Sequence, residues 1–168
     1  MIHVCSLARL YDTIDATGAR HIVTLLRLSD RVDRPAHIAP ENHLVLAMDD
    51  IAAPMEGYTA PGEEHVQRLI GFVGQWDRAA PMVVHCFAGI SRSTAGAYVA
   101  ACALNPARDE QSIAWDIRRA SRTAYPNPRI VSIADRLLKR DGRMVRAIET
   151  IGPGDAATEG EPFGLALD

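Results

Sequence analysis

Several features that restrict a protein's function are scarce in this chain of 168 residues. There are only three cysteines, Cys5, Cys86 and Cys102, and so small and odd a number does not build a disulfide framework. No apolar run approaches the ~20 residues of a membrane-spanning helix. The N-terminus also lacks the basic and apolar regions of a secretory signal. We therefore expect a cytoplasmic protein with no membrane partner.

Neither sign of charge is in large excess. The formal net charge is −3, which gives no reason to expect nucleic acid as a partner. Of the 18 basic residues only Lys139 is a lysine, and this bias is typical of a GC-rich bacterial genome. A hydrophobic content of 48% and a charged content of 23% are those of a globular protein, and the length suits one domain.

Short apolar runs alternate with helical patterns in the first two thirds of the chain. We expect strands at 1–7, 21–26, 43–48 and 81–86, and helices at 8–17, 61–76 and 94–104. A helical cluster follows, with a helix capped by Asn105 or Asp109 and others at 130–140 and 144–151. This order predicts an α/β fold with a mainly parallel sheet of four to five strands, covered on both faces. The nearly all-apolar run 43–48 is expected to be buried on both sides.

The chain shows no internal repeat and no linker, so residues 1–151 are expected to form one domain. Residues 152–168 contain Gly, Pro and acidic residues and are expected to form a loosely held tail. Phe163, Leu165 and Leu167 are its only candidate anchors.

The most informative stretch is 85–93, His-Cys-Phe-Ala-Gly-Ile-Ser-Arg-Ser, between a predicted strand and a predicted helix. A loop that opens a helix is a ready anion site, because its N–H groups and the helix dipole favour negative charge. The same field favours a thiolate at Cys86. Gly89 allows a positive φ and a close backbone approach. Arg92 carries a planar fork suited to two phosphate oxygens.

This stretch resembles the His-Cys-x5-Arg-Ser/Thr signature of cysteine-dependent protein tyrosine phosphatases, and residues 88–93 are most similar to the small dual-specificity branch. The resemblance implies a three-layer phosphatase-like fold. It makes Cys86 the nucleophile and Arg92 the phosphate clamp, with Ser93 bonded to the thiolate and His85 setting its acidity from behind. The residues that would cradle the phosphate are Phe87, Ala88, Gly89, Ile90, Ser91 and Arg92.

Phosphoryl transfer also needs a general acid for the leaving oxygen. The family places an aspartate in a loop after a strand, some thirty or more residues before the cysteine. Asp49 and Asp50 fit this description, with Glu56 a weaker third. The pattern of small dual-specificity enzymes favours Asp50 as the acid and leaves Asp49 to shape the turn, although the loop is slightly longer than usual and the choice stays open.

A second similarity to small dual-specificity phosphatases lies in the Arg-rich segment 118–127, which ends in Pro-Asn. It implies that Asn127 braces the phosphate loop. Its arginines, Arg118, Arg119 and Arg122, fit a solvated helix face better than a substrate site. The histidines outside the signature have no metal-ligand spacing, and we expect no metal and no cofactor.

The expected function is therefore a phosphatase that hydrolyses phosphotyrosine in proteins or peptides through a phosphocysteine. Whether it acts on phosphotyrosine alone or also on phosphoserine and phosphothreonine stays open at this point. A non-catalytic phosphate-binding module and a rhodanese-like sulfurtransferase are the alternatives. A phosphoinositide phosphatase is less favoured, because its loop usually carries lysines. Cys5 is a candidate for a disulfide that protects an oxidised Cys86, and Cys102 is expected in the core. The oligomeric state cannot be read from the sequence.

Overall fold

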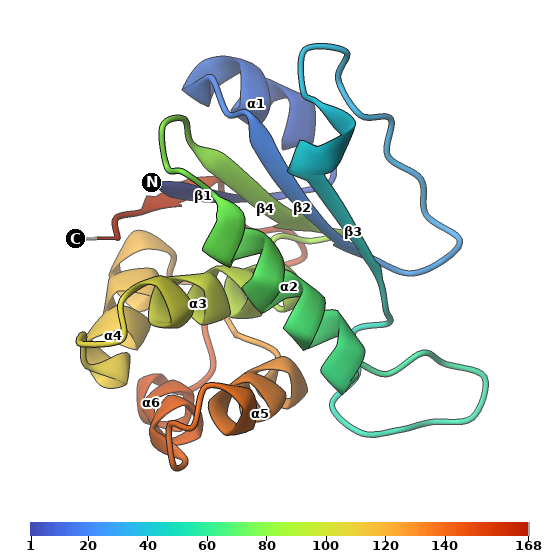
Figure 1. The fold of residues 1–168 in the computed structure, drawn as a ribbon. Helices are drawn as coiled ribbons and strands as arrows, with labels where there is room; N and C mark the ends of the chain where they lie inside the picture. Colours follow the sequence, from blue (N-terminus) through green and yellow to red (C-terminus); the bar gives the residue numbers. More distant parts are fainter. Residues whose placement is uncertain (168) are drawn as a thin grey trace.

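A five-stranded sheet forms the centre of the molecule, with helices packed on both faces (Figure 1). The computed structural model describes residues 1–167, so residue 168 of the predicted tail lies outside it. The strands follow the order β3-β2-β4-β1-β5. Their bounds are β1 Ile2–Ser6, β2 His21–Leu26, β3 His43–Ala47, β4 Met82–Cys86 and β5 Phe163–Leu165.

The first four strands are parallel, and β5 runs antiparallel to β1. The helices are α1 Leu10–Thr17, α2 Glu63–Gln75, α3 Arg92–Leu104, α4 Glu110–Ala120, α5 Pro128–Leu137 and α6 Arg143–Ile151. A short 3₁₀ turn, η1 Pro40–Asn42, precedes β3. The predicted α/β fold with a mainly parallel sheet and a C-terminal helical cluster is confirmed.

Alternate residues of the central strand β4 face two separate cores, as the pleat of a strand requires. Val83 packs with Leu10 and Ile14 of α1 on one face. Val84 and Cys86 face the larger core, which α2 to α6 cover. The nucleophile predicted from the sequence therefore lies on the side of the sheet that carries most of the helices.

On that side helix α3 packs against β1, β2 and β4. Its residues 92–102 are all buried, and most of them are small. At Gly96 an added Cβ would come within 3.1 Å of Val84 and 3.2 Å of Leu25. The small residues thus allow α3 to approach the strands, which fixes the position of its N-terminus at the end of β4.

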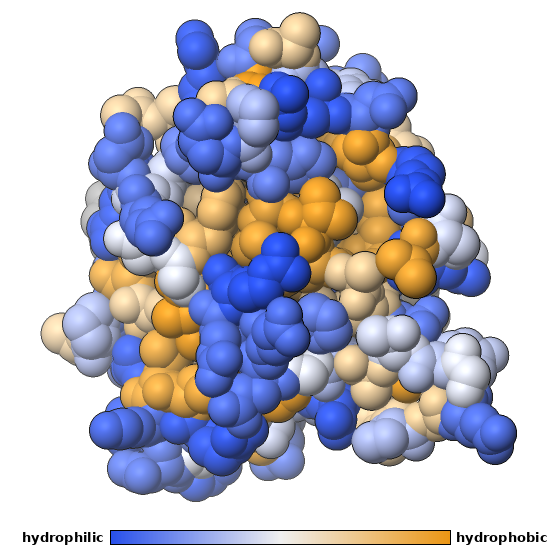
Figure 2. All heavy atoms as spheres, turned by 45° about the vertical axis from the view of Figure 1, so that its right-hand side comes forward, coloured by the Kyte–Doolittle hydropathy of each residue, from blue (hydrophilic) through white to orange (hydrophobic). Residues whose placement is uncertain are grey.

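The expectation that the third strand is covered on both faces is wrong. β3 lies at one edge of the sheet, and Val45 is 50% exposed while Leu44 and Leu46 are buried. α2 packs on only one of its faces, and no helix of the described chain covers the other. Figure 2, which brings this side forward, shows apolar surface there. The apolar character of a run does not distinguish an edge strand from a central strand, so the sequence could not show this exposure.

In the C-terminal cluster the structure decides the cap of one helix and moves the start of another. Asp109, and not Asn105, caps α4 by accepting a hydrogen bond from the Ser112 N–H at 2.7 Å. α5 begins at Pro128 instead of Ile130, because proline suits the first turn of a helix and Asn127 caps it.

The tail is held more firmly than expected. Residues 163–165 form β5 beside β1 (Figure 1). The anchors Phe163, Leu165 and Leu167 are buried as predicted. The physical reason is that β1 would otherwise present an unpaired edge. Within the described residues, no helix is long and apolar enough to cross a membrane.

Candidate active site

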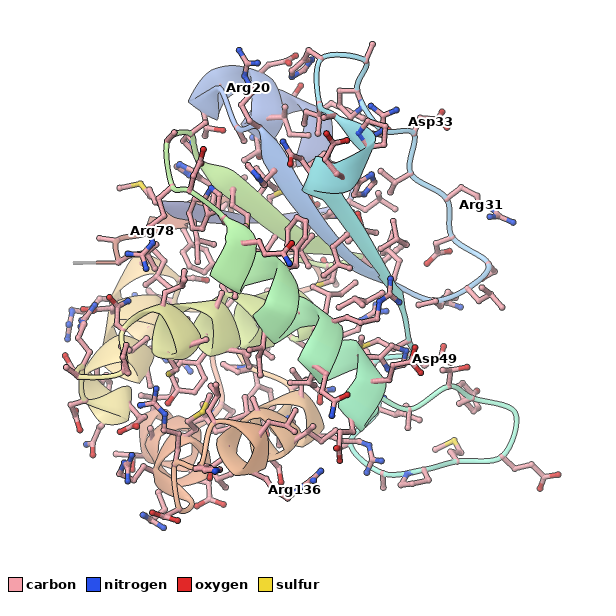
Figure 3. The ribbon with its side chains drawn as sticks, in the orientation of Figure 1. Arg20, Arg31, Asp33, Asp49, Arg78 and Arg136 are labelled. Carbon is pink, nitrogen blue, oxygen red and sulfur yellow. The ribbon has the colours of Figure 1, made fainter. Side chains whose placement is uncertain are left out.

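The predicted site residues meet at the carboxyl ends of the parallel strands, where ligands bind in sheets of this kind. Cys86 is the last residue of β4, and Ser6 is its partner at the end of β1. Asp49 and Asp50 follow β3, and Figure 3 shows Asp49 where the chain leaves that strand and enters the loop 49–62.

Cys86 is 2% exposed, and its sulfur lies inside the loop 87–91. The Gly89 N–H donates to Sγ at 3.3 Å. Sγ lies 3.1 Å from the hydroxyl of Ser93, which accepts from a thiol and can donate to a thiolate. Gly89 has a φ of 74°, and an added Cβ would lie 2.7 Å from the backbone nitrogen of Ser6. Only glycine fits this turn against β1.

Arg92 is a buried cation without a carboxylate partner among residues 1–167. The residue is 5% exposed, and its Nη1 donates to the carbonyl of Met48 at 2.7 Å. Its Nε is buried and has no hydrogen-bond partner in the described structure. A buried charge of this kind calls for an anion beside it.

The carbonyl groups of the loop 87–91, the predicted phosphate loop, point outward, and three other segments of the chain hold them. Because the C=O and N–H of a trans peptide point in opposite directions, the following N–H groups are turned toward the inside of the loop, where an anion can be bound. The four contacts are Leu7 N–H to Phe87 O (3.1 Å), Gly160 N–H to Ala88 O (2.8 Å), Tyr125 N–H to Ile90 O (2.9 Å) and Asn127 N–H to Ser91 O (3.2 Å).

The two candidate acids have different surroundings. Oδ1 of Asp50 accepts hydrogen bonds from the Ser91 hydroxyl at 2.7 Å and from Asn127 Nδ2 at 2.8 Å, so this carboxylate is tied to the phosphate loop. Oδ2 of Asp49 accepts instead from the N–H of Thr59 at 2.8 Å, within its own loop. Glu56 is exposed in that loop.

Asn127 links three parts of the site. Its Oδ1 caps α5 by accepting from the N–H groups of Arg129 and Ile130, at 3.0 and 3.1 Å. Its Nδ2 donates to Asp50, and also to the carbonyl of Ile51 at 3.3 Å. Its own N–H is bound to Ser91. One side chain thereby joins the helix, the acidic loop and the phosphate loop.

His85 points to the opposite face of the sheet from Cys86. Its Nε2 lies 2.7 Å from the hydroxyl of Thr24, which lies 2.8 Å from Nε2 of His43. Burial, with a smaller contribution from His43, lowers the pKa of His85 to about 3, so the ring is neutral near pH 7. Sequence reasoning missed Thr24, because only the register Thr24↔His85 between β2 and β4 brings it there.

The other two cysteines are also buried and form no disulfide. Cys5 pairs in register with His85 and faces the α1 core, so the sheet separates its side chain from that of Cys86. Burial raises the pKa of Cys5 to about 11 and that of Cys102 to about 12. The structure therefore argues against a disulfide between Cys5 and Cys86 without rearrangement of the sheet.

The arginines of segment 118–127 serve the structure around the site. Arg118 donates to the carbonyls of Arg122 and Gly152, at 2.6 and 2.8 Å. Arg119 pairs with Asp116, and Arg122 pairs with Asp155 in the tail at 2.9 Å. Arg118 and Arg122 thus hold the end of α4 and the start of the tail together, while the Arg119 pair lies within α4. In residues 1–167, no group of three or more His, Cys, Asp or Glu side chains is arranged to hold a metal ion.

Comparison with solved structures shows that several dual-specificity and tyrosine phosphatases have the same fold as this chain. The Cydia pomonella PTP-2 phosphatase matches with a TM-score of 0.62 at 17% identity, over 79% of this chain and 83% of its own. Human DUSP28 matches with a TM-score of 0.62 at 17% identity, over 83% and 88%. DUSP15 matches with a TM-score of 0.60 at 18% identity, over 92% and 94%. At these identities the likeness establishes the fold.

The family is established by the sequence. No curated protein matches the chain. A family model described as "Tc-R-P: Polymorphic toxin system, DSP-PTPase phosphatase" matches residues 4–106, which is more than half of the chain and includes the whole signature loop. This confirms the resemblance to the dual-specificity branch, and the chain belongs to this family of cysteine-dependent DSP-PTPase phosphatases.

Proposed function

We propose that the protein hydrolyses phosphotyrosine, and also phosphoserine and phosphothreonine, in phosphorylated proteins or peptides. The thiolate of Cys86 attacks phosphorus, so that an S–P bond forms while the bond to the leaving oxygen breaks. Asp50 gives its proton to that oxygen. Water then attacks the phosphocysteine, Asp50 takes its proton, and phosphate and thiolate are released.

The observation that carries this proposal is the buried guanidinium of Arg92 beside the buried sulfur of Cys86. The cation has no carboxylate partner in the described chain and a free Nε, and a phosphoryl group supplies the missing negative charge. Arg92 and the inward N–H groups of the loop 87–91 then stabilise the charge on the equatorial oxygens during transfer. The carboxylate of Asp50 beside this loop favours a phosphatase over a sulfurtransferase, because a sulfurtransferase needs no general acid at this position.

The remaining residues support this chemistry. Ser93 donates to the thiolate, and its distance of 3.1 Å from Sγ suits that role. His85 positions the end of β4 as a neutral ring. Asn127 holds Asp50 toward the loop, and Asp49 shapes the loop that carries it. The reaction requires no metal, no cofactor and no nucleic acid, and a reactive thiolate suits a reducing compartment such as the cytoplasm.

Assays on phosphotyrosine, phosphoserine and phosphothreonine peptides, in excess EDTA, test the proposal. We expect the wild type to turn over substrate and to be inhibited by vanadate. We expect no turnover by Cys86→Ser, although this variant keeps the loop that binds the anion. Arg92→Lys should lose most of the rate, because an ammonium group cannot reproduce the two-pronged fork. Appreciable turnover by Cys86→Ser, or a strict need for divalent metal, would refute the mechanism.

The general acid is tested by a matched pair of variants. Asp50→Asn keeps an oxygen that accepts from Ser91 and Asn127, so the site stays in place while the proton is lost. Its kcat on peptides should fall by about 10²-fold or more, and by less on an activated aryl phosphate. Asp49→Asn keeps the acceptor for Thr59 and should cost severalfold at most. If the two variants exchange these results, Asp49 is the acid.

A further inference from the structure

A hollow of about 380 Å³ lies beside the phosphate loop, next to the nucleophile. Three segments that are far apart in the sequence form it: the connection from β1 to α1, the loop itself and the C-terminal tail. Phe87 and Ala88, on its floor, directly follow Cys86, and Phe87 is 57% exposed. The lining residues are Leu7, Ala8, Phe87, Ala88, Thr158 and Glu159.

The tail side of this hollow is fixed in place by its neighbours. The N–H of Gly160 donates to the Ala88 carbonyl at 2.8 Å, and a Cβ on Gly160 would lie 2.9 Å from the carbonyl oxygen of Gly89. Five residues earlier, the Asp155 N–H donates to the carbonyl of Arg122 at 2.9 Å. The segment that contains Glu159 is thereby anchored at both ends, and Thr158 and Glu159 form the tail side of the hollow.

The charge of the hollow is unbalanced. Four of its six lining residues are apolar, and Glu159 is the only ionisable one. Oε1 of Glu159 accepts a hydrogen bond from the buried hydroxyl of Ser6. Its Oε2 has no hydrogen bond or ion pair with any residue from 1 to 167. A carboxylate at the side of an apolar floor fits an aliphatic stem that ends in a cation, and it repels an acidic group.

We propose that this hollow binds a lysine or arginine side chain of the substrate, adjacent in sequence to its phosphorylated residue, and that Glu159 is the residue that selects it. The inference rests on the proposed phosphoprotein substrate. A phosphoryl group held at Cys86 brings the neighbouring substrate residue to the floor made by Phe87 and Ala88. The stem of the cation covers these side chains, and its charge pairs with Oε2 of Glu159.

Three phosphopeptides that differ only at the positions flanking the phosphorylated residue test the proposal. These positions carry lysine, norleucine or glutamate, and kcat/KM is measured for each at low and high salt. The wild type should prefer the lysine peptide to the glutamate peptide by about fivefold or more, with norleucine between them. The preference should shrink at high salt, because the pair is partly exposed.

Variants of the tail separate Glu159 from its neighbours. Glu159→Gln keeps the acceptor for Ser6 and should bring the lysine-to-glutamate ratio close to one, and Glu159→Lys should invert it. Glu161→Gln removes an exposed carboxylate that does not line the hollow and should keep the wild-type ratio. Because the lysine-to-glutamate ratio of kcat/KM is taken within each variant, a general change in the activity of that variant does not affect it.

The outcomes also distinguish a failure of the proposed subsite from a failure of the proposed phosphatase function. Equal rates on the three peptides, or a preference that survives Glu159→Gln, would overturn the subsite while the phosphatase assignment stands. Hydrolysis of aryl phosphate without hydrolysis of any phosphopeptide would overturn the proposed substrate class, and the subsite with it.

Discussion

The buried ion pair between Glu110 and Arg140, next to α3, offers a sharp test of what stabilises the fold. Oε1 of Glu110 accepts from Arg140 at 2.8 Å, and their side chains are only 5% and 8% exposed. Arg143 donates to the second carboxylate oxygen at 3.1 Å. The backbone carbonyl of Glu110 accepts from the hydroxyl of Tyr98, on α3. The perturbation is Glu110→Ala, which leaves the guanidinium of Arg140 buried without its carboxylate.

The expected loss of stability follows from this burial. Breaking a buried pair by removing one partner costs about 3–5 kcal/mol, since the other charge stays desolvated. For a chain of this length about 1 kcal/mol corresponds to roughly 2–4 °C, so the melting temperature should fall by about 10 °C. Glu110→Gln keeps an acceptor oxygen and should cost less. Arg136→Ala breaks an exposed pair with Glu63 and should cost below about 1 kcal/mol.

The effect of pH has a definite sign. Burial opposes ionisation of Glu110, but hydrogen bonds from Arg143 and Arg140 outweigh it and hold the pKa below the usual 4.5. A lowered pKa in the folded state means that the stabilisation is complete above about pH 4.5 and is lost as the pH falls through the lowered value.

Urea unfolding of the wild type, Glu110→Gln and Glu110→Ala at pH 7 and pH 3 measures both effects. The advantage of the wild type over Glu110→Gln should narrow at pH 3, because this pH lies below the ordinary pKa of 4.5 and part of the stabilisation that the lowered pKa supplies is lost there. At a temperature well below melting, kcat on an aryl phosphate should be nearly unchanged in these variants. A cost for Glu110→Ala no larger than that of Arg136→Ala, or a gap independent of pH, would refute the reasoning.

Three further variants test contacts around the loop. Asn127→Ala removes the cap of α5 and a hydrogen bond to Asp50; unfolding should show a loss of about 1–2 kcal/mol, and kcat on peptides should fall about tenfold. Gly89→Ala forces a Cβ into the backbone of β1 at a positive φ, so vanadate affinity and kcat/KM should fall together by about 10²-fold; unchanged vanadate binding would contradict this. Thr24→Val leaves Nε2 of His85 without its hydrogen-bond partner, so the free energy of unfolding should fall by about 1–3 kcal/mol. A loss outside this range in unfolding experiments would contradict the role given to this hydroxyl.

Much of the fold was predictable because local patterns carried it. β2, β4 and the helix that ends before Gly18 appear where they were expected, since a short apolar run and a glycine helix cap are local patterns in the chain. β3 shows the limit of such reasoning. Its residues are apolar in either position, and only the strand order makes it an edge with Val45 exposed.

The sequence by itself determined the residues on which the proposed chemistry depends, because residues 85–93 bring a cysteine, a glycine and an arginine together within one strand–loop–helix unit. The surroundings of that unit were decided by the tertiary structure. Asp50 differs from Asp49 through its contacts with Ser91 and Asn127, which lie 41 and 77 residues away. Ser6 meets Glu159 across 153 residues. Such hydrogen bonds depend on how strands and loops pack, and neither residue's local sequence encodes its distant partner.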